Sequence, residues 1–401
     1  MKVAINGVGI AGPTLAYWLR RGNHEPVMFE RATKPRTGGY LIDFWGLGYD
    51  IAQRMGILPT LTEAGYLVNS LRMLDADGHQ VAALDVEPMR RLLHGRFISV
   101  ARTDLAAVLL HACGDTRTHF GVTIAGIAPE EDGVVVKLSN GTLERFDLVI
   151  GADGLHSRVR ELAFGSTSQF ERSLDCYVAA FRIPGYAHRE ELTYVSHTVP
   201  ERQVGRVSLR NDETMVILIC RAHLIGDDPP RRQQRAALRR AFANMAWEVP
   251  QMLDAMERAD EVYFDRVSQM HLPRWSGPRV GLVGDAAACV SLLAGEGAGL
   301  AMVESFVLAG ELHRAGSDVA RALEMYEQRL RTLVLAKQAA ALRYRSFFSP
   351  RTSLALHVRN LAVRSMSLPF LAKRFISRSL HDRFELPDYF DAGSCETTER
   401  D

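Results

Sequence analysis

The sequence has few cysteines, and no two of them lie close together. Its five cysteines are spread over 401 residues without a C-x-x-C motif. An odd number of widely spaced thiols argues against a disulfide framework and against a zinc site. We therefore expect reduced cysteines and no bound metal.

Long apolar segments and an excess of one charge are also missing. No segment reaches the roughly 18 uninterrupted apolar residues that a membrane-spanning helix needs, and the first residues, MKVAINGVGIAG, turn glycine-rich too early for a signal peptide. The formal net charge is +1, which gives no indication of a nucleic-acid partner. These absences predict a cytoplasmic protein without a transmembrane segment.

What the sequence does contain is an ordinary globular composition in a long chain. Hydrophobic residues make up 47% and charged residues 24% of the sequence, and both values are typical of folded proteins. Because 401 residues exceed one common core, we expect either two subdomains or one large α/β domain with an insertion.

The N-terminus predicts a βαβ unit. Lys2–Asn6 is a short apolar strand, and Ala11–Arg21 has helical spacing and ends at Gly22. Pro26–Phe29 is a second apolar run, closed by Glu30. This order of elements is the usual setting of a dinucleotide-binding turn.

Three glycines occupy the turn of this unit. Gly7 permits the tight turn, Gly9 lets the backbone approach a pyrophosphate, and Gly12 lets the helix pack closely on the strand. Glu30 lies where an acid accepts a hydrogen bond from an adenosine ribose. Since an acid there tolerates a free 2′-hydroxyl and disfavours a 2′-phosphate, the motif predicts NAD or FAD rather than NADP.

Hydrophobic periodicity predicts further elements along the chain. Strands are expected at Tyr40–Trp45, Val134–Leu138, Leu143–Ile150 and Val280–Val283, and helices at Val100–Ala112, Arg231–Glu257 and from Gly297 to about Arg364. Apolar and polar residues alternate over roughly 170–225, which is typical of an antiparallel sheet with one covered face.

A second motif reads DLVIGADGLHSRVR over residues 147–160. A buried strand runs into a turn that contains Asp153, and Ser157 is a suitable N-cap for the helix beyond it. The motif closely resembles the G-A-D-G-x-x-S-x-V-R signature of the flavin-dependent group A monooxygenases, the p-hydroxybenzoate hydroxylase-like aromatic hydroxylases. The resemblance implies that this segment, with Asp153, lies near the FAD pyrophosphate and the path by which nicotinamide approaches.

A third motif, GLVGDAAACVSLLAGEGAGLAMVES over residues 281–305, resembles the second flavin signature of the same family. The resemblance implies that Asp285 accepts from the ribityl hydroxyls, and that Gly295, Gly297 and Gly299 bring amide groups and a helix N-terminus toward the pyrimidine edge of the flavin. We interpret the small residues around Asp285 as room for the chain to pass flat against the flavin.

The third motif departs from the family pattern at three positions. Ala288, Leu292 and Glu296 stand where family members usually carry His, Pro and Gln. The missing proline changes the loop that faces the reactive edge of the flavin, and with it the expected substrate pocket.

Three further residues match the family in order. Arg102 in VARTDL stands where the family has an arginine near the FAD phosphates, and Arg36 and Asp43 in RTGGYLIDFWG stand where the family's chain returns past the flavin. A guanidinium suits a pyrophosphate because it can donate two parallel hydrogen bonds. The alternative for either arginine is a surface position.

The resemblance implies an α/β fold with four segments. Residues 1–168 and 269–330 would form a Rossmann-like FAD-binding domain, 169–268 an inserted antiparallel sheet domain that binds substrate, and 331–401 a C-terminal helical region. Between residues 331 and 383 there are eleven Lys or Arg and one acid. A membrane surface or acidic partner is one interpretation, and a solvated helical layer is the favoured one.

The resemblance also implies a reaction. NAD(P)H would reduce FAD, oxygen would add to give a flavin 4a-hydroperoxide, and one oxygen atom would go to an aromatic or polyketide-like small molecule, as in family members that oxidise tetracycline-type antibiotics. Only one G-x-G-x-x-G is present, so nicotinamide would bind transiently. The alternatives are a flavin-dependent reductase or dehydrogenase acting on a lipid or isoprenoid, and a non-catalytic FAD-binding protein.

No catalytic residue is assigned from the sequence. A general base could activate a phenolic ring by taking its proton. His197, Tyr194 and Arg206 are candidates by location on the predicted sheet, and an ordinary role in that sheet is the favoured interpretation.

Overall fold

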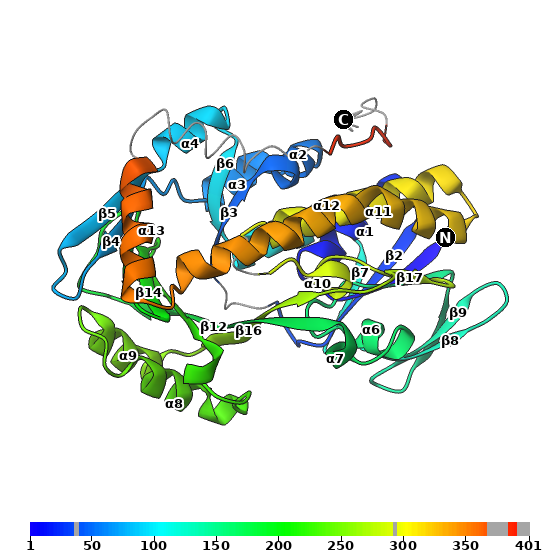
Figure 1. Ribbon diagram of the computed structural model, residues 1–401. Helices are drawn as coiled ribbons and strands as arrows, with labels where there is room; N and C mark the ends of the chain where they lie inside the picture. The colour runs from blue at the N-terminus through cyan, green and yellow to red at the C-terminus, as the bar shows by residue number, and fades with distance from the viewer. Residues whose placement is uncertain (36–39, 292–294, 367–383, 391–401) are drawn as a thin grey trace.

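The computed structural model describes residues 1–35, 40–291, 295–366 and 384–390, except for the side chains of 343–346 and Met366. Two residues singled out in the sequence, Arg36 and Leu292, lie outside the described residues. The fold is α/β and contains two large sheets of different kinds (Figure 1).

The first large sheet is mainly parallel. Its order is β17 (Ser276–Gly277), β18 (Val280–Leu282), β11 (Leu148–Gly151), β1 (Lys2–Asn6), β2 (Glu25–Glu30) and β7 (Arg117–Phe120). The edge strand β17 is antiparallel to β18, and the other pairs are parallel. Because helices cover both faces, the central strands are continuous apolar runs, and Val3, Ala4 and Ile5 are all fully buried.

The second large sheet is mainly antiparallel. Its order is β16 (Tyr263–Met270), β12 (Glu171–Pro184), β15 (Glu213–Arg221), β14 (Arg202–Ser208), β13 (Thr193–Val199), β4 (Ser70–Leu74) and β5 (Gln80–Asp85). The antiparallel strands expected over 170–225 are present, and the sheet also recruits β16, β4 and β5, with β4 parallel to β13. Strands β12 to β16 come between β11 and β18 in the chain, while the domain limits remain a prediction.

Two smaller sheets complete the strands. One is the antiparallel pair β3 (Leu41–Trp45) and β6 (Phe97–Ala101), and the other has the order β10 (Leu143–Phe146), β9 (Val134–Leu138) and β8 (Ile124–Pro129).

The α-helices of the described residues cover these sheets. They are α1 (Ala11–Arg21), α2 (Gly46–Arg54), α3 (Leu58–Ala64), α4 (Glu87–Leu92), α5 (Arg102–Ala112), α6 (Arg158–Ala163), α7 (Thr167–Phe170), α8 (Arg231–Phe242), α9 (Val249–Arg258), α10 (Asp285–Ala288), α11 (Gly297–Ala315), α12 (Val319–Phe348) and α13 (Ser353–Met366). A short 3₁₀-helix follows β15 at Ala222–Leu224.

The two faces of the seven-stranded sheet have different neighbours. On one face, Phe181 and Leu218 pack with Phe242 of α8 and Met252 of α9. On the other face, a smaller cluster includes Val178 and is bordered by Phe348, the last residue of α12. Figure 1 shows α8 and α9 on one side of this sheet and α12 passing along the other. The second face is the one turned toward the parallel sheet.

Three predicted elements differ from the structure because tertiary pairing overrides local pattern. The helix predicted from Val100 begins at Arg102, since the residues before it form β6 and pair with β3. The strand predicted over Leu143–Ile150 is two strands, divided at Asp147, whose side chain accepts from Lys2 N at 2.6 Å. The predicted Arg231–Glu257 helix is also divided, because the chain turns between α8 and α9.

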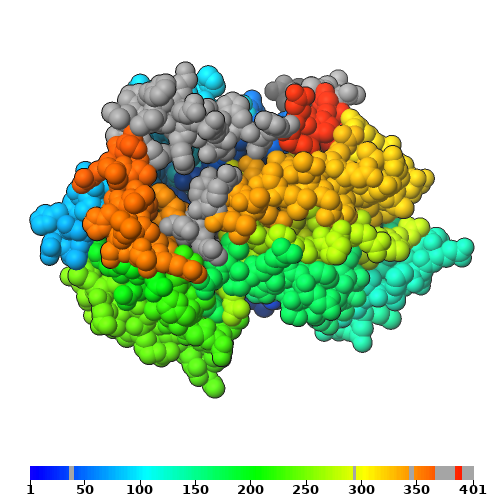
Figure 2. All heavy atoms as spheres, viewed as in Figure 1, coloured from blue at the N-terminus to red at the C-terminus, as the bar shows by residue number. Residues whose placement is uncertain are grey.

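The predicted helical C-terminal part is present as α11, α12 and α13, although not as one continuous run. No helix in the described part of the chain is both long enough and apolar enough to cross a membrane. Residues 384–390 lie on the outside of the molecule beside α11 and α12 (Figure 2). Tyr389 covers Gly310 of α11, where a Cβ atom would lie 2.2 Å from the tyrosine ring.

Candidate active site

A large cavity lies where the carboxyl ends of the parallel strands meet. Its volume is about 860 Å³, within the range of about 300–1,000 Å³ that small-molecule and cofactor sites occupy. Open α/β sheets bind ligands at this edge. Eight residues predicted from the sequence line the cavity: Gly7, Gly9, Glu30, Arg102, Asp153, Asp285, Gly295 and Gly297.

The three glycines after β1 have different surroundings. Gly7 has φ of +112°, and a Cβ atom there would lie 2.4 Å from Ala152 O. A Cβ atom on Gly12 would lie 2.0 Å from Gly7 O. Gly9 has no neighbour within 4 Å of its Cβ position and lines the cavity. Gly7 and Gly12 therefore allow the chain to pack on itself, whereas Gly9 leaves room for a ligand.

Glu30 holds the shape of the glycine loop. Its Oε2 accepts from Val8 N at 3.0 Å and its Oε1 accepts from Ala32 N at 3.0 Å. A carboxylate has about four acceptor positions, so two remain for hydroxyl groups of a ligand in the cavity.

Asp153 uses its carboxylate to bind protein groups. Its Oδ2 accepts from Asn6 Nδ2 at 2.8 Å and from the backbone of Arg158 and Val159 at the start of α6, and Ser157 Oγ donates to its Oδ1. Ser157 is the N-cap of α6, as predicted. Asp153 thus organises the second motif, and Asn6, which sequence reasoning did not single out, ties it to β1.

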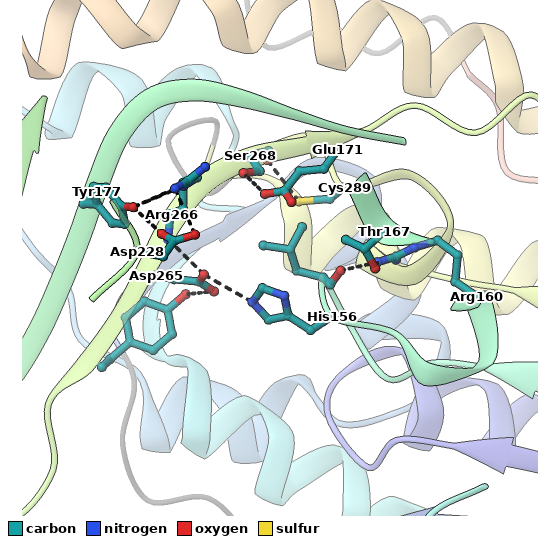
Figure 3. Close-up of polar contacts among 12 residues, drawn as sticks. His156, Arg160, Thr167, Glu171, Tyr177, Asp228, Asp265, Arg266, Ser268 and Cys289 are labelled. Atoms are coloured by element: carbon teal, nitrogen blue, oxygen red, sulfur yellow. Dashed lines mark hydrogen bonds and ion pairs between the residues drawn. The ribbon is translucent and has the colours of Figure 1, made fainter. Parts of the chain in front are cut away.

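Arg160 is a second residue that sequence reasoning missed. It is fully buried, and its guanidinium donates to Ala286 O at 3.1 Å, to Thr167 Oγ1 at 3.0 Å and to Leu155 O. The bond to Ala286 O joins the second motif to α10 in the third motif, and Figure 3 shows the Arg160 side chain beside Thr167. The signal was present, because an arginine inside a motif of buried strand and helix must find partners.

The small residues around Asp285 have a different explanation from the one expected. Ala286, Ala287 and Ala288 are buried in protein, and none of them lines the cavity, unlike Gly284 and Asp285. Gly284 has φ of +64°. The alanines are small because α10 packs against protein, and only the residues at its N-terminal end face the cavity.

Behind this turn, Glu304 is a buried acid on α11. Its carboxyl accepts from Gly284 N, and the side chain has no exposed surface. Burial raises the pKa of Glu304 well above its usual range. We therefore expect a neutral carboxyl that braces the backbone before Asp285.

Arg102 lies in the cavity among two tyrosines and an acid. Burial opposes its charge, but Tyr40 and Asp285 outweigh burial and raise the pKa of Arg102. For the phenol of Tyr40, burial raises the pKa to about 12. At neutral pH the cavity thus holds a fixed cation beside phenols that keep their protons, which suits a diphosphate.

Comparison with known proteins agrees with this geometry. Residues 1–340 match the model of a family described as FAD binding domain. The chain belongs to this family. It is 33% identical over 342 residues to a flavin-dependent monooxygenase from an unknown prokaryotic organism, and the match covers 84% of this chain and 87% of that protein.

Solved structures show the same fold over nearly the whole chain. Tetracycline destructase Tet(51) superposes with a TM-score of 0.83 at 30% identity, covering 97% of this chain and 99% of that one. HpxO of Klebsiella pneumoniae, in complex with FAD and uric acid, has a TM-score of 0.76 at 22% identity, covering 95% and 96% of the two chains. The chain is a flavoprotein monooxygenase of the aromatic hydroxylase type, and FAD is its cofactor.

The structure fits FAD in its own right. The cavity runs past the open Cβ position of Gly9 to Asp285 and the N-terminus of α11. A helix N-terminus offers unpaired amide groups and a positive dipole end. The pyrophosphate and the flavin ring both need such groups.

The remaining predicted flavin residues lie elsewhere. Asp43 and Gly299 line a second, smaller cavity of about 30 Å³, next to Gly295. Asp43 accepts from Ser99 Oγ at 2.6 Å, and burial raises the pKa of its carboxyl. Gly299 lets α11 pack on α2, because Gly48 approaches it closely.

The three base candidates taken from the sequence do not line the large cavity. Arg206 is paired with Glu248 at 2.7 Å, and His197 Nδ1 lies 3.2 Å from Leu74 O. Tyr194 borders an apolar cluster. The titratable residues that β16 brings to the cavity are Tyr263, Asp265 and Arg266.

Proposed function

We propose that this flavoprotein monooxygenase uses NAD(P)H and O₂ to hydroxylate an aromatic or polyketide-like small molecule. One observation supports the proposal most: a single cavity joins the cofactor loops to the inner face of the seven-stranded sheet. Gly9 and Asp285 line one part, and Val178, Tyr263 and Val267 line another. A flavin held by the loops would face a chamber with apolar and aromatic walls, which suits a planar substrate.

The roles of the cofactor and of the residues around it follow from their positions in the cavity. When bound, FAD would supply the redox chemistry, the acceptance of hydride and the activation of oxygen. Gly9, Arg102, Asp285 and the amides at Gly295 and Gly297 would hold and orient it. The dipole of α11 would stabilise negative charge on the reduced ring, and the surrounding sheet would exclude water.

The relatives support the substrate class. Tet(51) is a tetracycline destructase, and the HpxO structure contains uric acid. Both descriptions name small ring compounds, tetracycline and uric acid. In this proposal, residues 1–168 and 269–330 hold FAD, and 169–268 hold the substrate.

Anaerobic stopped-flow absorbance tests the proposal. The purified protein is reduced with NADH or NADPH and then mixed with oxygenated buffer containing tetracycline or a planar phenol, with product detected by mass spectrometry. We expect a transient absorbance band before the oxidised flavin returns, and a product heavier by one oxygen atom. Substrate reduction without oxygen uptake would favour a reductase, and flavin that no nicotinamide bleaches would favour a non-catalytic protein.

A further inference from the structure

Large apolar side chains are exposed mainly on two helices near the C-terminus. Of the eight large hydrophobic side chains that are exposed in the described part of the chain, five belong to α12 and α13. On α12 they are Leu335 and Leu342, and on α13 they are Leu354, Val358 and Leu361. Figure 2 shows both helices on the same face of the molecule. Single exposed leucines are common, but such clustering marks an interaction surface.

The three residues of α13 form a continuous stripe. Leu354, Val358 and Leu361 are spaced by four and then three positions, so they lie on one side of the helix. Their exposed fractions are 75%, 59% and 67%. Ala355 and Ala362, the next residues after Leu354 and Leu361, are exposed as well. We call Leu354, Val358 and Leu361 the α13 stripe.

The side of α13 that faces the protein is partly polar. Arg359 is only 7% exposed, and its Nη1 donates to Thr198 Oγ1 at 3.2 Å. Val363 packs with Met73 and Ala82. Burying a guanidinium costs free energy, whereas leaving leucines in water forfeits the gain from burying them. Packing among the described residues therefore gives no reason for the stripe to point outward.

The charge of this region has one sign. Between residues 331 and 383 the sequence has eleven Lys or Arg and one acid, although the whole chain is almost neutral, with 48 Lys or Arg and 47 Asp or Glu. On α13 itself Arg364 is exposed. Just before the helix, the side chain of Arg351 is 64% exposed and pairs with Asp175 at 3.2 Å. An apolar stripe flanked by basic side chains is typical of helices that lie on anionic membranes.

We propose that α13 docks on an anionic lipid surface, with the α13 stripe inserted among the acyl chains and the basic side chains at the headgroups. The inference is independent of the proposed reaction. The helix would lie in the plane of the membrane, so it needs neither the length nor the uniform apolarity of a spanning segment. The sequence alone favoured a solvated layer here, and the outward direction of the stripe is the observation that changes this interpretation.

A protein partner fits this surface less well than a membrane does. Stable protein interfaces take about 20–30 residues from each partner and are enriched in aromatic side chains, whereas the α13 stripe is narrow and aliphatic. A membrane sets no minimum area, and each inserted side chain adds to binding. Anionic headgroups also match the basic charge of this region, which would repel a second copy docked through the same face.

Vesicle co-sedimentation of the holoenzyme tests the proposal. Wild-type protein should bind vesicles of equal parts phosphatidylglycerol and phosphatidylcholine more strongly than vesicles of phosphatidylcholine alone, and salt should weaken the binding. Leu361→Glu should lower the vesicle partition coefficient about tenfold or more, because a charge replaces an inserted apolar side chain. Leu361→Phe should bind like wild type. Leu354→Glu should lower binding as Leu361→Glu does, and it decides the matter if Leu361→Glu loses FAD.

Leu143→Glu is the matched control. Leu143 is 66% exposed, close to the 67% of Leu361, but it lies on β10 in the three-stranded sheet. Figure 1 shows β8 and β9 of that sheet at the opposite end of the molecule from α13. The control therefore adds the same charge at an equally exposed leucine, and its vesicle binding should equal that of wild type.

Three results would overturn the proposal. The first is wild-type holoenzyme that binds neither kind of vesicle, or binds both kinds equally at low salt. The second is equal binding by Leu361→Glu and Leu143→Glu. The third is a wild-type dimer in sedimentation velocity that becomes monomeric in Leu361→Glu, since the stripe would then contact a second copy of the chain.

Discussion

Gly9 and Gly12 belong to the same loop, and the structure predicts opposite consequences for replacing them with alanine. A Cβ atom at residue 12 would lie 2.0 Å from Gly7 O, whereas a Cβ atom at residue 9 meets nothing within 4 Å. Neither glycine has a positive φ, so both alanines are conformationally allowed. Gly12→Ala should therefore damage the fold, and Gly9→Ala should damage only the ligand site.

The magnitudes follow from packing. Forcing a methyl group into a filled space costs about 1–3 kcal/mol, and each kcal/mol lowers Tm by roughly 2–4 °C in a domain of about 150–250 residues. Apoprotein carrying Gly12→Ala should thus unfold several degrees below wild type. For Gly9→Ala, the free energy of unfolding of the apoprotein should stay within about 0.5 kcal/mol of wild type. Its Kd for FAD should rise about tenfold or more, which corresponds to a loss of about 1.4 kcal/mol in binding free energy.

Two measurements decide the matter. Apoprotein Tm is measured by calorimetry after FAD is removed, and FAD affinity is measured by quenching of flavin fluorescence. Gly277→Ala is the matched control, because Gly277 also has open space at its Cβ position but lies in β17, away from the cavity. A wild-type FAD Kd in Gly9→Ala would refute the approach of the pyrophosphate to this residue, and a wild-type Tm in Gly12→Ala would refute the packing argument.

Three further predictions concern polar groups that are buried or partly buried. Arg160→Met should lower the apoprotein free energy of unfolding by roughly 1–3 kcal/mol in urea titrations, because Ala286 O and its neighbours lose their donor. Glu296 and Lys337 form an ion pair at 2.8 Å, with 20% and 14% of their side chains exposed. Glu296→Lys and Lys337→Glu each break this pair and should each weaken FAD binding. In a double-mutant cycle, the protein with both changes should recover part of the lost affinity. The pKa of His24 is lowered to about 4, mainly by burial and further by the charges of the N-terminal amino group and His313. In the unfolded chain the pKa of a histidine is about 6.5. The free energy of unfolding should therefore be unaffected by His24 above about pH 6.5 and should decrease as the pH falls toward 4. His24→Asn should flatten that loss in urea titrations at acid pH, and an unchanged slope would contradict the assignment.

The N-terminal unit could be predicted from the sequence because its signals agree with one another. The apolar run, the glycines, the helical spacing and the closing acid all favour one βαβ unit, and β1 and α1 have the predicted bounds. Such agreement between local sequence preferences and the fold is typical of segments whose structure is determined by their own sequence. The antiparallel strands of the middle region were readable for the same reason.

Strands that form only because they pair with distant parts of the chain could not be predicted from the local sequence. Phe97–Ala101 continues directly into α5, and its apolar residues fit a helix as well as a strand. It is a strand because β3, far away in the chain, offers it a partner. Likewise β4 and β5 gave no signal of joining a sheet whose other strands begin only at Glu171, far later in the chain.

Within the site, the motifs revealed the residues better than their roles. Asp153 stands in a flavin signature, yet its oxygens accept from Asn6, Ser157 and the start of α6. A sequence shows that a carboxylate is near a cofactor turn, but not which way it points. Tyr263 and Asp265 carried no motif, and only the pairing of β16 with β12 places them at the cavity.

Buried polar bonds join the motifs into one framework. Asn6 at the end of β1 bonds to Asp153 in the second motif at 2.8 Å, and Arg160 of the second motif bonds to Ala286 in the third at 3.1 Å. The carboxyl of Glu304 holds the turn before α10 from behind. Because breaking one of these bonds would leave a buried donor or acceptor without its partner, these links favour a single arrangement of the loops in the protein itself. FAD would then bind without ordering them, which spares about 0.5–1.5 kcal/mol for each side chain that need not be immobilised.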